Sequence, residues 1–339
     1  MGCDRPGPAL PRRRAPLQDT ALRDRLIPMS PAVLSATAPS LRHHTAPHPA
    51  PWRDLDHIGV EICLENVASV RLAVRAGADR AELCDNLTVG GTTPSIGAVE
   101  AAILAASEEV EAKRQRIGAH WASSKDGAPF GLRIMIRPRG GGFVYDGDGR
   151  RAMIADVRRI AALSREMSEY TRPVPTSNPA RPLPPAVDLG IVVGGLTDDG
   201  AVDRGLIRLL KDLADGAPLT YHRAIDASRD PLEAYRDLRR LGVDYVLTSG
   251  AADTALDGAR TIAAMVAEEG PRVIATGTVR GHNAAEVIEA TGAGEIHLRC
   301  SFPDLPPHLP QNTDEEQVRE IVEAARALPV PGRPGRSEG

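Results

Sequence analysis

PLTYHRAIDASRDPLEAYRDLRRLGVDYVLTS, residues 218–249, contains one complete strand–helix–strand unit. Its first five residues, which end at His222, predict a short strand, and DYVLTS at residues 244–249 predicts a second one. Between them, Pro231 marks the start of a helix and Gly242 marks its end. A strand, a helix and a further strand in this order predict a parallel βαβ unit.

The same alternation repeats about eight times along the chain of 339 residues. The predicted strands cover residues 58–63, 80–84, 132–137, 188–194, 218–222, 244–249, 272–277 and 295–299. The predicted helices cover residues 67–76, 96–109, 152–163, 204–213, 231–241, 256–268, 284–291 and 313–328. Eight such units in about 270 residues predict an α/β fold of the (β/α)8 TIM-barrel type. A doubly wound sheet would be favoured by a glycine-rich loop after the first strand, and EICLEN (residues 61–66) is not one.

Proline marks the limits of this barrel. Of the 29 prolines, ten lie in residues 1–57, six in residues 172–185 and seven after Ser301. Because proline breaks regular elements, we expect a disordered tail over residues 1–57, a single barrel domain over residues 58–328 and a flexible tail over residues 329–339. Two insertions into the barrel are expected, near residues 119–129 and 164–185. No apolar run follows the arginines of the first tail, so a secretory signal is not expected.

Composition excludes several classes of protein. Hydrophobic residues make up 42% of the chain and charged residues 25%, as in a globular protein. No stretch approaches the roughly 18–20 apolar residues that cross a membrane. A net charge of −4 and 3% aromatic residues do not suggest a nucleic-acid partner. The four cysteines (Cys3, Cys63, Cys84 and Cys300) are too scattered for a disulfide framework, so we expect a cytoplasmic protein.

Polar side chains stand at nearly every predicted strand end, where TIM barrels hold their functional sites. They are Glu61, Cys63, Glu82, Cys84, Arg137, Arg139, His222, Arg223, Asp226, Thr248, Ser249, Thr276, Thr278 and His297. Polar groups are unfavourable to bury unless they are paired, so this face is predicted to bind a ligand.

At these same residues the chain resembles the CutC family of copper homeostasis proteins. The matching stretches are EIC (residues 61–63), GADRAELCDNL and GGTTPSIG (within residues 77–97), IRPRGG (from residue 136), GGLTDDGAVD (residues 194–203), YHRAID (residues 221–226), LTSGAADTALDG (residues 247–258) and EIH (residues 295–297). They occur in family order over roughly residues 58–299. The resemblance implies a cytoplasmic TIM barrel associated with copper.

Two cysteines suit that metal, because Cu(I) prefers thiolate sulfur and few ligands. Cys63 and Cys84 end the first two strands, which are neighbours at about 4.8 Å, and each follows a glutamate by two residues. They are predicted to bridge one Cu(I), with His222 or His297 as a third ligand. The competing interpretation is that both are small, inert core residues, and a redox disulfide is a third possibility. Cys3 and Cys300 are expected to be incidental.

The alternative function is an enzyme acting on a small carboxylate or phosphate metabolite. Guanidinium groups bind such anions, and Arg137 together with Arg139 and Arg223 would line the pocket. The other candidate anion-binding residues are Asp226, Ser249, Gly277 and His297. The candidate catalytic residues are Glu61, Glu82, Arg137 and His222. A ring of structural Glu–Arg salt bridges is the competing interpretation of these charges.

Other classes of function lack their signatures. The three lysines (Lys113, Lys125 and Lys211) lie away from strand ends, which argues against a Schiff-base aldolase. HExxH, P-loop and GxSxG patterns are absent from the sequence. The expected partners are therefore a copper ion or a small anion, without nucleic acid or membrane. A homo-oligomer is possible in either case.

Overall fold

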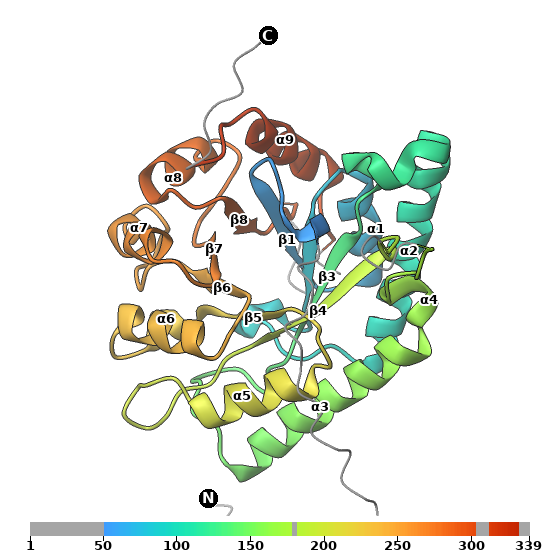
Figure 1. The fold of residues 1–339 in the computed structure, drawn as a ribbon. Helices are drawn as coiled ribbons and strands as arrows, with labels where there is room; N and C mark the ends of the chain where they lie inside the picture. Colours follow the sequence, from blue (N-terminus) through green and yellow to red (C-terminus); the bar gives the residue numbers. More distant parts are fainter. Residues whose placement is uncertain (1–50, 178–181, 303–311, 332–339) are drawn as a thin grey trace, which may run out of the picture. The chain divides into compact units, whose positions relative to one another are not determined.

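A computed structural model describes residues 51–177, 182–302 and 312–331. Eight parallel strands close into a barrel in the order β1 to β8, with the helices outside it (Figure 1). The strands are β1 Gly59–Leu64, β2 Arg80–Leu83, β3 Phe130–Met135, β4 Val187–Val193, β5 Leu219–Tyr221, β6 Tyr245–Thr248, β7 Arg272–Ala275 and β8 Glu295–Leu298. The predicted (β/α)8 barrel is confirmed.

The helices follow the strands as expected, and several begin at side-chain caps. They are α1 Val67–Arg75, α2 Ile96–Ile117, α3 Gly147–Glu166, α4 Ser168–Thr171, α5 Arg204–Leu213, α6 Pro231–Arg240, α7 Ala259–Ala267, α8 Ala284–Thr291 and α9 Glu315–Arg326. Asn66 caps α1 and Ser95 caps α2, each accepting a hydrogen bond from a backbone N–H of the first turn. Within the described residues, no helix is both long and apolar enough to cross a membrane.

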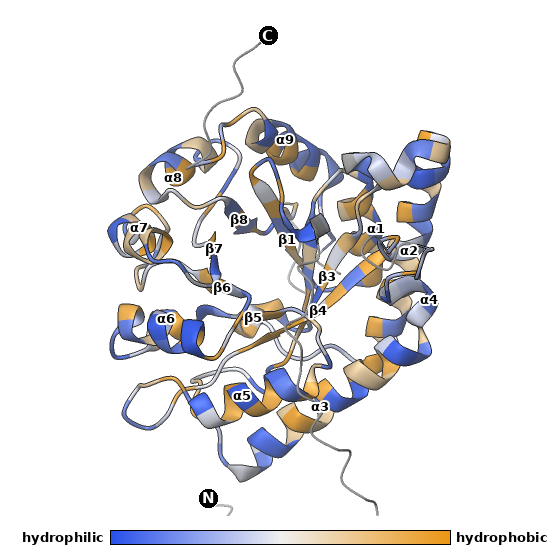
Figure 2. Cartoon of the chain, in the orientation of Figure 1, coloured by the Kyte–Doolittle hydropathy of each residue, from blue (hydrophilic) through white to orange (hydrophobic). Residues whose placement is uncertain are grey.

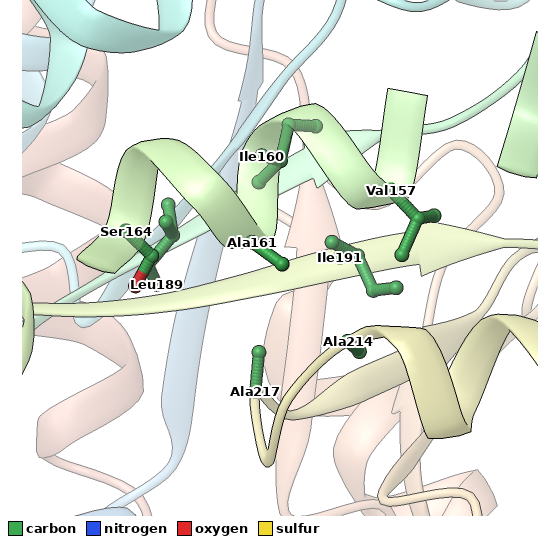
Figure 3. A pocket seen from close by; sticks show the side chains of 8 residues that line it. All are labelled: Val157, Ile160, Ala161, Ser164, Leu189, Ile191, Ala214 and Ala217. Carbon is green, nitrogen blue, oxygen red and sulfur yellow. The ribbon is translucent and has the colours of Figure 1, made fainter. Parts of the chain in front are cut away.

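The main apolar core lies between the barrel and its helices. Strand residues such as Ile62, Leu132 and Ile134 are fully buried there against helix residues such as Ile103 and Met153. Helices α3 and α5 alternate hydrophobic and hydrophilic segments in Figure 2, as expected for helices with one buried face. A small apolar pocket, lined by Val157, Ala161, Ile191 and Ala217 among others, lies in this layer (Figure 3). It is therefore a packing defect in the helix–sheet layer rather than a site at the strand ends.

Charged side chains occupy the inside of the barrel. Arg80 Nε donates to Glu61 Oε2 at 2.8 Å, and the same guanidinium pairs with Glu295. Arg133 Nη2 donates to Asp188 Oδ2 at 2.9 Å. All five residues are at most 6% exposed, so their charges are stabilised by one another rather than by water. The barrel interior thus combines these ion pairs with two small apolar clusters, one of Cys84, Met135 and Val192 and one of Tyr245, Leu247 and Ile274.

The amino-terminal end of the barrel is covered by residues that we expected in the tail. A short 3₁₀ helix, Pro51–Arg53, places the Arg53 guanidinium on Asp188, with Nη2–Oδ1 at 2.6 Å. Arg272 of β7 binds both the Arg53 carbonyl and the Asp54 carboxylate. The predicted boundary after residue 57 is therefore too late, because ion pairs tie residues 53 and 54 to the barrel. The rest of that predicted tail, residues 1–50, lies outside the described residues.

In both insertions, the limits in the structure differ from the predicted ones. Helix α2 continues to Ile117 and is followed by two 3₁₀ turns, Gly118–Ser123 and Lys125–Gly127. Helix α3 continues to Glu166, so the second segment begins later than residue 164. Arg114 holds both segments: its Nε donates to Gly127 O at 3.0 Å and its Nη2 to Pro185 O at 2.6 Å. Residues 178–181 of the second segment, and residues 332–339 of the predicted carboxyl tail, lie outside the described residues.

Candidate metal centre at the carboxyl ends of the strands

Three potential metal ligands meet where β1, β2 and β8 lie side by side. One donor atom each from Cys63, Glu82 and His297 lies within 4.8 Å of the others. The Cys63 Sγ atom is 3.4 Å from Glu82 Oε2, and His297 Nε2 is 3.7 Å from the same oxygen. Their side chains face the barrel interior because each occupies an alternate, inward position of its strand. We call Cys63, Glu82, Cys84 and His297 the mouth cluster.

The register of β1 and β2 places Cys63 opposite Glu82 rather than opposite Cys84. Cys84 follows Glu82 by two residues and lies just beyond the end of β2 at Leu83. The two thiols still lie close together, because a hydrogen bond joins the Cys63 and Cys84 side chains. Glu82 joins them, because its Oε2 accepts a hydrogen bond from Cys63 Sγ and another from Cys84 Sγ at 3.5 Å.

A carboxylate fixes the orientation of His297. Its Nδ1 is 2.8 Å from Glu61 Oε1, which leaves Nε2 directed to the mouth cluster. Glu61 is in turn paired with Arg80. Burial alone would raise the pKa of Glu61, but Arg80 and His297 hold it at about 2. Glu61 is therefore an anion that orients the imidazole, the arrangement found behind metal-bound histidines.

The charges in the mouth cluster depend on one another. The hydrogen bond from Cys84 lowers the pKa of Cys63 well below its usual value, and His297 adds to this against the effect of burial. The same hydrogen bond, together with burial, raises the pKa of Cys84. Burial raises the pKa of Glu82, and the Cys63 sulfur adds to the rise. Burial lowers the pKa of His297, but hydrogen bonds to Cys63 and Glu61 outweigh it and raise the pKa overall.

The predicted anion-binding arginines hold loops instead of lining a common pocket. Arg137 is 5% exposed, and its Nη1 donates to Val89 O at 2.9 Å and Gly91 O at 2.8 Å. Its Nη2 donates to Gly141 O at 2.7 Å. Arg139 donates to carbonyls of its own loop, including Val144 O at 2.7 Å. The prediction that these residues bind an anion stays a prediction, since most of their donors are already used.

His222 lies on the β4–β5 side of the mouth and is not part of the mouth cluster. Its Nδ1 accepts the backbone N–H of Ala224 at 3.0 Å, and its ring lies 5.1 Å from that of Phe143. A Cβ at Gly194 would lie 2.1 Å from the His222 ring, so glycine is required there. Burial, together with the charge of Arg137, lowers the pKa of His222 to about 3. Of the two histidines predicted as a third ligand, His297 is the one beside the cysteines.

The remaining predicted residues bind one another across β5, β6 and β7. Asp226 Oδ2 accepts from Ser249 N and Ser249 Oγ, both at 3.0 Å, and from Arg223 Nε at 2.9 Å. Arg223 also donates to Ser249 Oγ at 2.7 Å. Gly277 has a φ of +99°, and a Cβ there would lie 2.8 Å from the Ser249 Cβ. Together these contacts close the loops at this side of the mouth.

Sequence reasoning missed Arg80 and Glu295, which are buried behind the mouth cluster. They were overlooked because they begin strands β2 and β8, and only strand ends were considered. A signal was present in the sequence: Arg80 and Glu82 share one face of RAELC, and Glu295 and His297 share one face of EIHL. Charged residues two positions before a candidate ligand therefore indicate its supporting ion pairs.

Comparison with known proteins identifies the family of the chain and supports its fold. Residues 58–167 and 186–301 match the model of the CutC family. The match is interrupted over the segment between α3 and β4, where we expected an insertion. The solved structure of a CutC protein from Streptococcus agalactiae has a TM-score of 0.53 and 28% identity, and the match covers 71% of this chain and 97% of that one. A Rubisco-like protein from Rhodopseudomonas palustris shares the fold alone, with a TM-score of 0.50 and 13% identity over 84% of this chain and 67% of that one.

Two relatives extend the comparison to sequence. A CutC family protein of Mesorhizobium japonicum is 35% identical over 249 residues, which are 73% of this chain and 79% of that protein. The human copper homeostasis protein cutC homolog is 31% identical over 244 residues, which are 71% of this chain and 72% of that protein. The family model covers well over half of the chain, and several relatives exceed 30% identity. This chain therefore belongs to the CutC family.

Proposed function

We propose that this protein acts in copper homeostasis by binding Cu(I) at the mouth cluster. Cys63 and Cys84 supply the sulfur ligands, and His297 Nε2 supplies a third donor. The observation that carries the proposal is the convergence of two thiols and one imidazole on the buried Glu82 side chain, from three adjacent strands. Soft thiolate ligands in a small number are the environment that Cu(I) prefers.

The surroundings of the cluster suit a bound metal. Cys63 is half-buried while Cys84 is 1% exposed, so an ion can reach the first thiol from solvent and be enclosed by the second. His297 is held by Glu61, which reduces the reorganisation that binding requires. Cys300, by contrast, packs within the main apolar core, where burial raises its pKa to about 12. It therefore serves as a matched control cysteine.

The test is a competitive Cu(I) titration of the reduced full-length protein against a chromophoric chelator. All variants carry Cys3→Ser, so that the tail thiol does not contribute. We expect one Cu(I) per chain, and a loss of affinity of at least about 100-fold in Cys63→Ser and in Cys84→Ser. Cys300→Ser should bind as tightly as the parent. Equal affinity of the parent and a Cys63→Ser/Cys84→Ser double variant would overturn the proposal.

The alternative function, an enzyme acting on a small anion, has no comparable cluster behind it. Arg137 and Arg139 donate mainly to backbone carbonyls, and Arg223 is engaged by Asp226 and Ser249. Glu61, a candidate catalytic residue, is paired with Arg80 in the barrel interior. The structural salt-bridge interpretation thus describes Glu61 well. No single observation favours the enzyme as a second proposal.

A further inference from the structure

Glu82 is the one member of the mouth cluster that a Cu(I) site does not need. Its carboxylate is a hard oxygen donor, whereas Cu(I) favours sulfur. The side chain is only 3% exposed. Its Oε2 accepts from both thiols, but Oε1 is buried and has no hydrogen-bond partner among the described residues.

The nearest buried cationic partners are already committed. Arg80 is shared between Glu61 and Glu295, and His297 is held by Glu61 through Nδ1 and reaches only the Oε2 atom of Glu82, at 3.7 Å from its Nε2. A buried acceptor without a partner is unfavourable by about 1–3 kcal/mol. Buried carboxylates are normally paired or bound to a metal ion. The unpartnered Oε1 therefore points to a cation as a ligand of this carboxylate.

The spacing of the donor atoms matches one coordination geometry. Bonds of about 2.0–2.3 Å from zinc to nitrogen, oxygen and sulfur, arranged as a tetrahedron, separate the ligand atoms by about 3.3–3.8 Å. The distance from Cys63 Sγ to Glu82 Oε2 is 3.4 Å, and that from His297 Nε2 to Glu82 Oε2 is 3.7 Å. An ion of this size fits among the three side chains with little rearrangement.

We propose that the mouth cluster also binds a divalent ion of the zinc class, through Cys63 Sγ, a Glu82 carboxylate oxygen and His297 Nε2. One thiolate and one carboxylate balance the two positive charges of such an ion. Three protein ligands leave a fourth position for water or an exchangeable group, as in catalytic rather than structural zinc sites. Cys63, the more exposed thiol, places that position toward solvent. The inference shares two residues with the proposed copper site but does not depend on copper binding.

Two variants distinguish the two metals. Glu82→Gln keeps the size of the side chain and removes its charge, so Zn(II) affinity should fall at least about tenfold, and by a larger factor than Cu(I) affinity. Cys84→Ser should do the reverse, weakening Cu(I) much more than Zn(II). Glu65→Gln is the control, because Glu65 follows β1 outside the cluster and pairs with Arg299. Affinities are measured on the reduced full-length protein carrying Cys3→Ser, by chelator competition for each metal.

A spectroscopic readout on the parent protein keeps the inference testable if a variant does not fold. Co(II) should give a thiolate-to-metal charge-transfer band and the intense visible bands of tetrahedral coordination. Zinc X-ray absorption should report one sulfur with nitrogen and oxygen neighbours. Octahedral Co(II) without the thiolate band, or Zn(II) affinity unchanged in a folded Glu82→Gln variant, would overturn the inference. Normal Cu(I) binding without Zn(II) binding defeats this inference alone, and the opposite result defeats the proposed copper function alone.

Discussion

The two sides of the barrel mouth carry similar side chains and use them differently. On the β1–β2–β8 side, Cys63, Glu82 and His297 point at one another, and one carboxylate oxygen of Glu82 is left without a hydrogen bond. On the β3–β6 side, Arg137 binds carbonyls of the surrounding loops, and Asp226 binds Ser249 and Arg223. A polar side chain at a strand end is thus a candidate metal ligand only when its polar atoms are not already used in hydrogen bonds within the protein. The difference can be tested by changing one residue at a time on each side.

The largest effect is expected behind the mouth cluster, at Arg80. The Arg80→Met variant would leave Glu61 and Glu295 buried without their shared cation, and the free energy of unfolding should fall by about 3–5 kcal/mol. Urea denaturation measures it. Arg75→Met is the matched control, because Arg75 makes an exposed ion pair with Glu109 and should change stability far less. Similar losses in both variants would show that the buried network does not support the cluster.

An intermediate effect is expected on the opposite side, at Arg137. The Arg137→Met variant loses hydrogen bonds to Val89, Gly91 and Gly141, so the free energy of unfolding should fall by about 2–3 kcal/mol. Cu(I) and Zn(II) affinities should stay unchanged, because the guanidinium serves the loops. The anion-enzyme interpretation predicts instead that the variant stays stable and loses binding of a small anion such as phosphate. Calorimetry with phosphate, together with urea denaturation, separates these outcomes.

The smallest effect is a pH dependence at His222. The folded protein binds a proton there only near its pKa of about 3, whereas the unfolded chain does so near 6.5. The unfolded state therefore binds more protons below about pH 6.5, and stability should fall as the pH decreases, by at most about 1.4 kcal/mol per pH unit. The His222→Gln variant should lack this fall in the free energy of unfolding when the pH decreases from about 7 to 5. A variant with the same pH profile as the parent would contradict the assignment.

The sequence predicts more of the fold than of the site. Helices at residues 204–213 and 284–291 match their predicted limits, because Asp203 before one and Gly292 after the other mark the ends locally. Strand ends also identify Cys63, Glu82 and His297 as inward-facing candidates. The pairing of Cys63 with Glu82 was not predictable, since a shift of two residues between β1 and β2 leaves both cysteines facing inward.

The use of the arginines could not be predicted either. Arg137 reaches carbonyls of residues 89 and 91, which lie far from it in the sequence and belong to another loop. Such contacts depend on the final path of both loops, and no local pattern encodes them. The same holds for Arg53, whose partner Asp188 follows it by 135 residues.

That last contact bears on the order in which the protein assembles during synthesis. At about 5–20 residues per second, the ribosome adds the 135 residues from Arg53 to Asp188 in about 7–27 s. The Arg272 contacts to residues 53 and 54 form later still, after more than half of the chain has been made. The amino-terminal segment therefore gains its contact with Asp188 only after β4 has been started, and its contacts with Arg272 only when β7 arrives. The earliest part of the barrel to be translated is among the last to be secured.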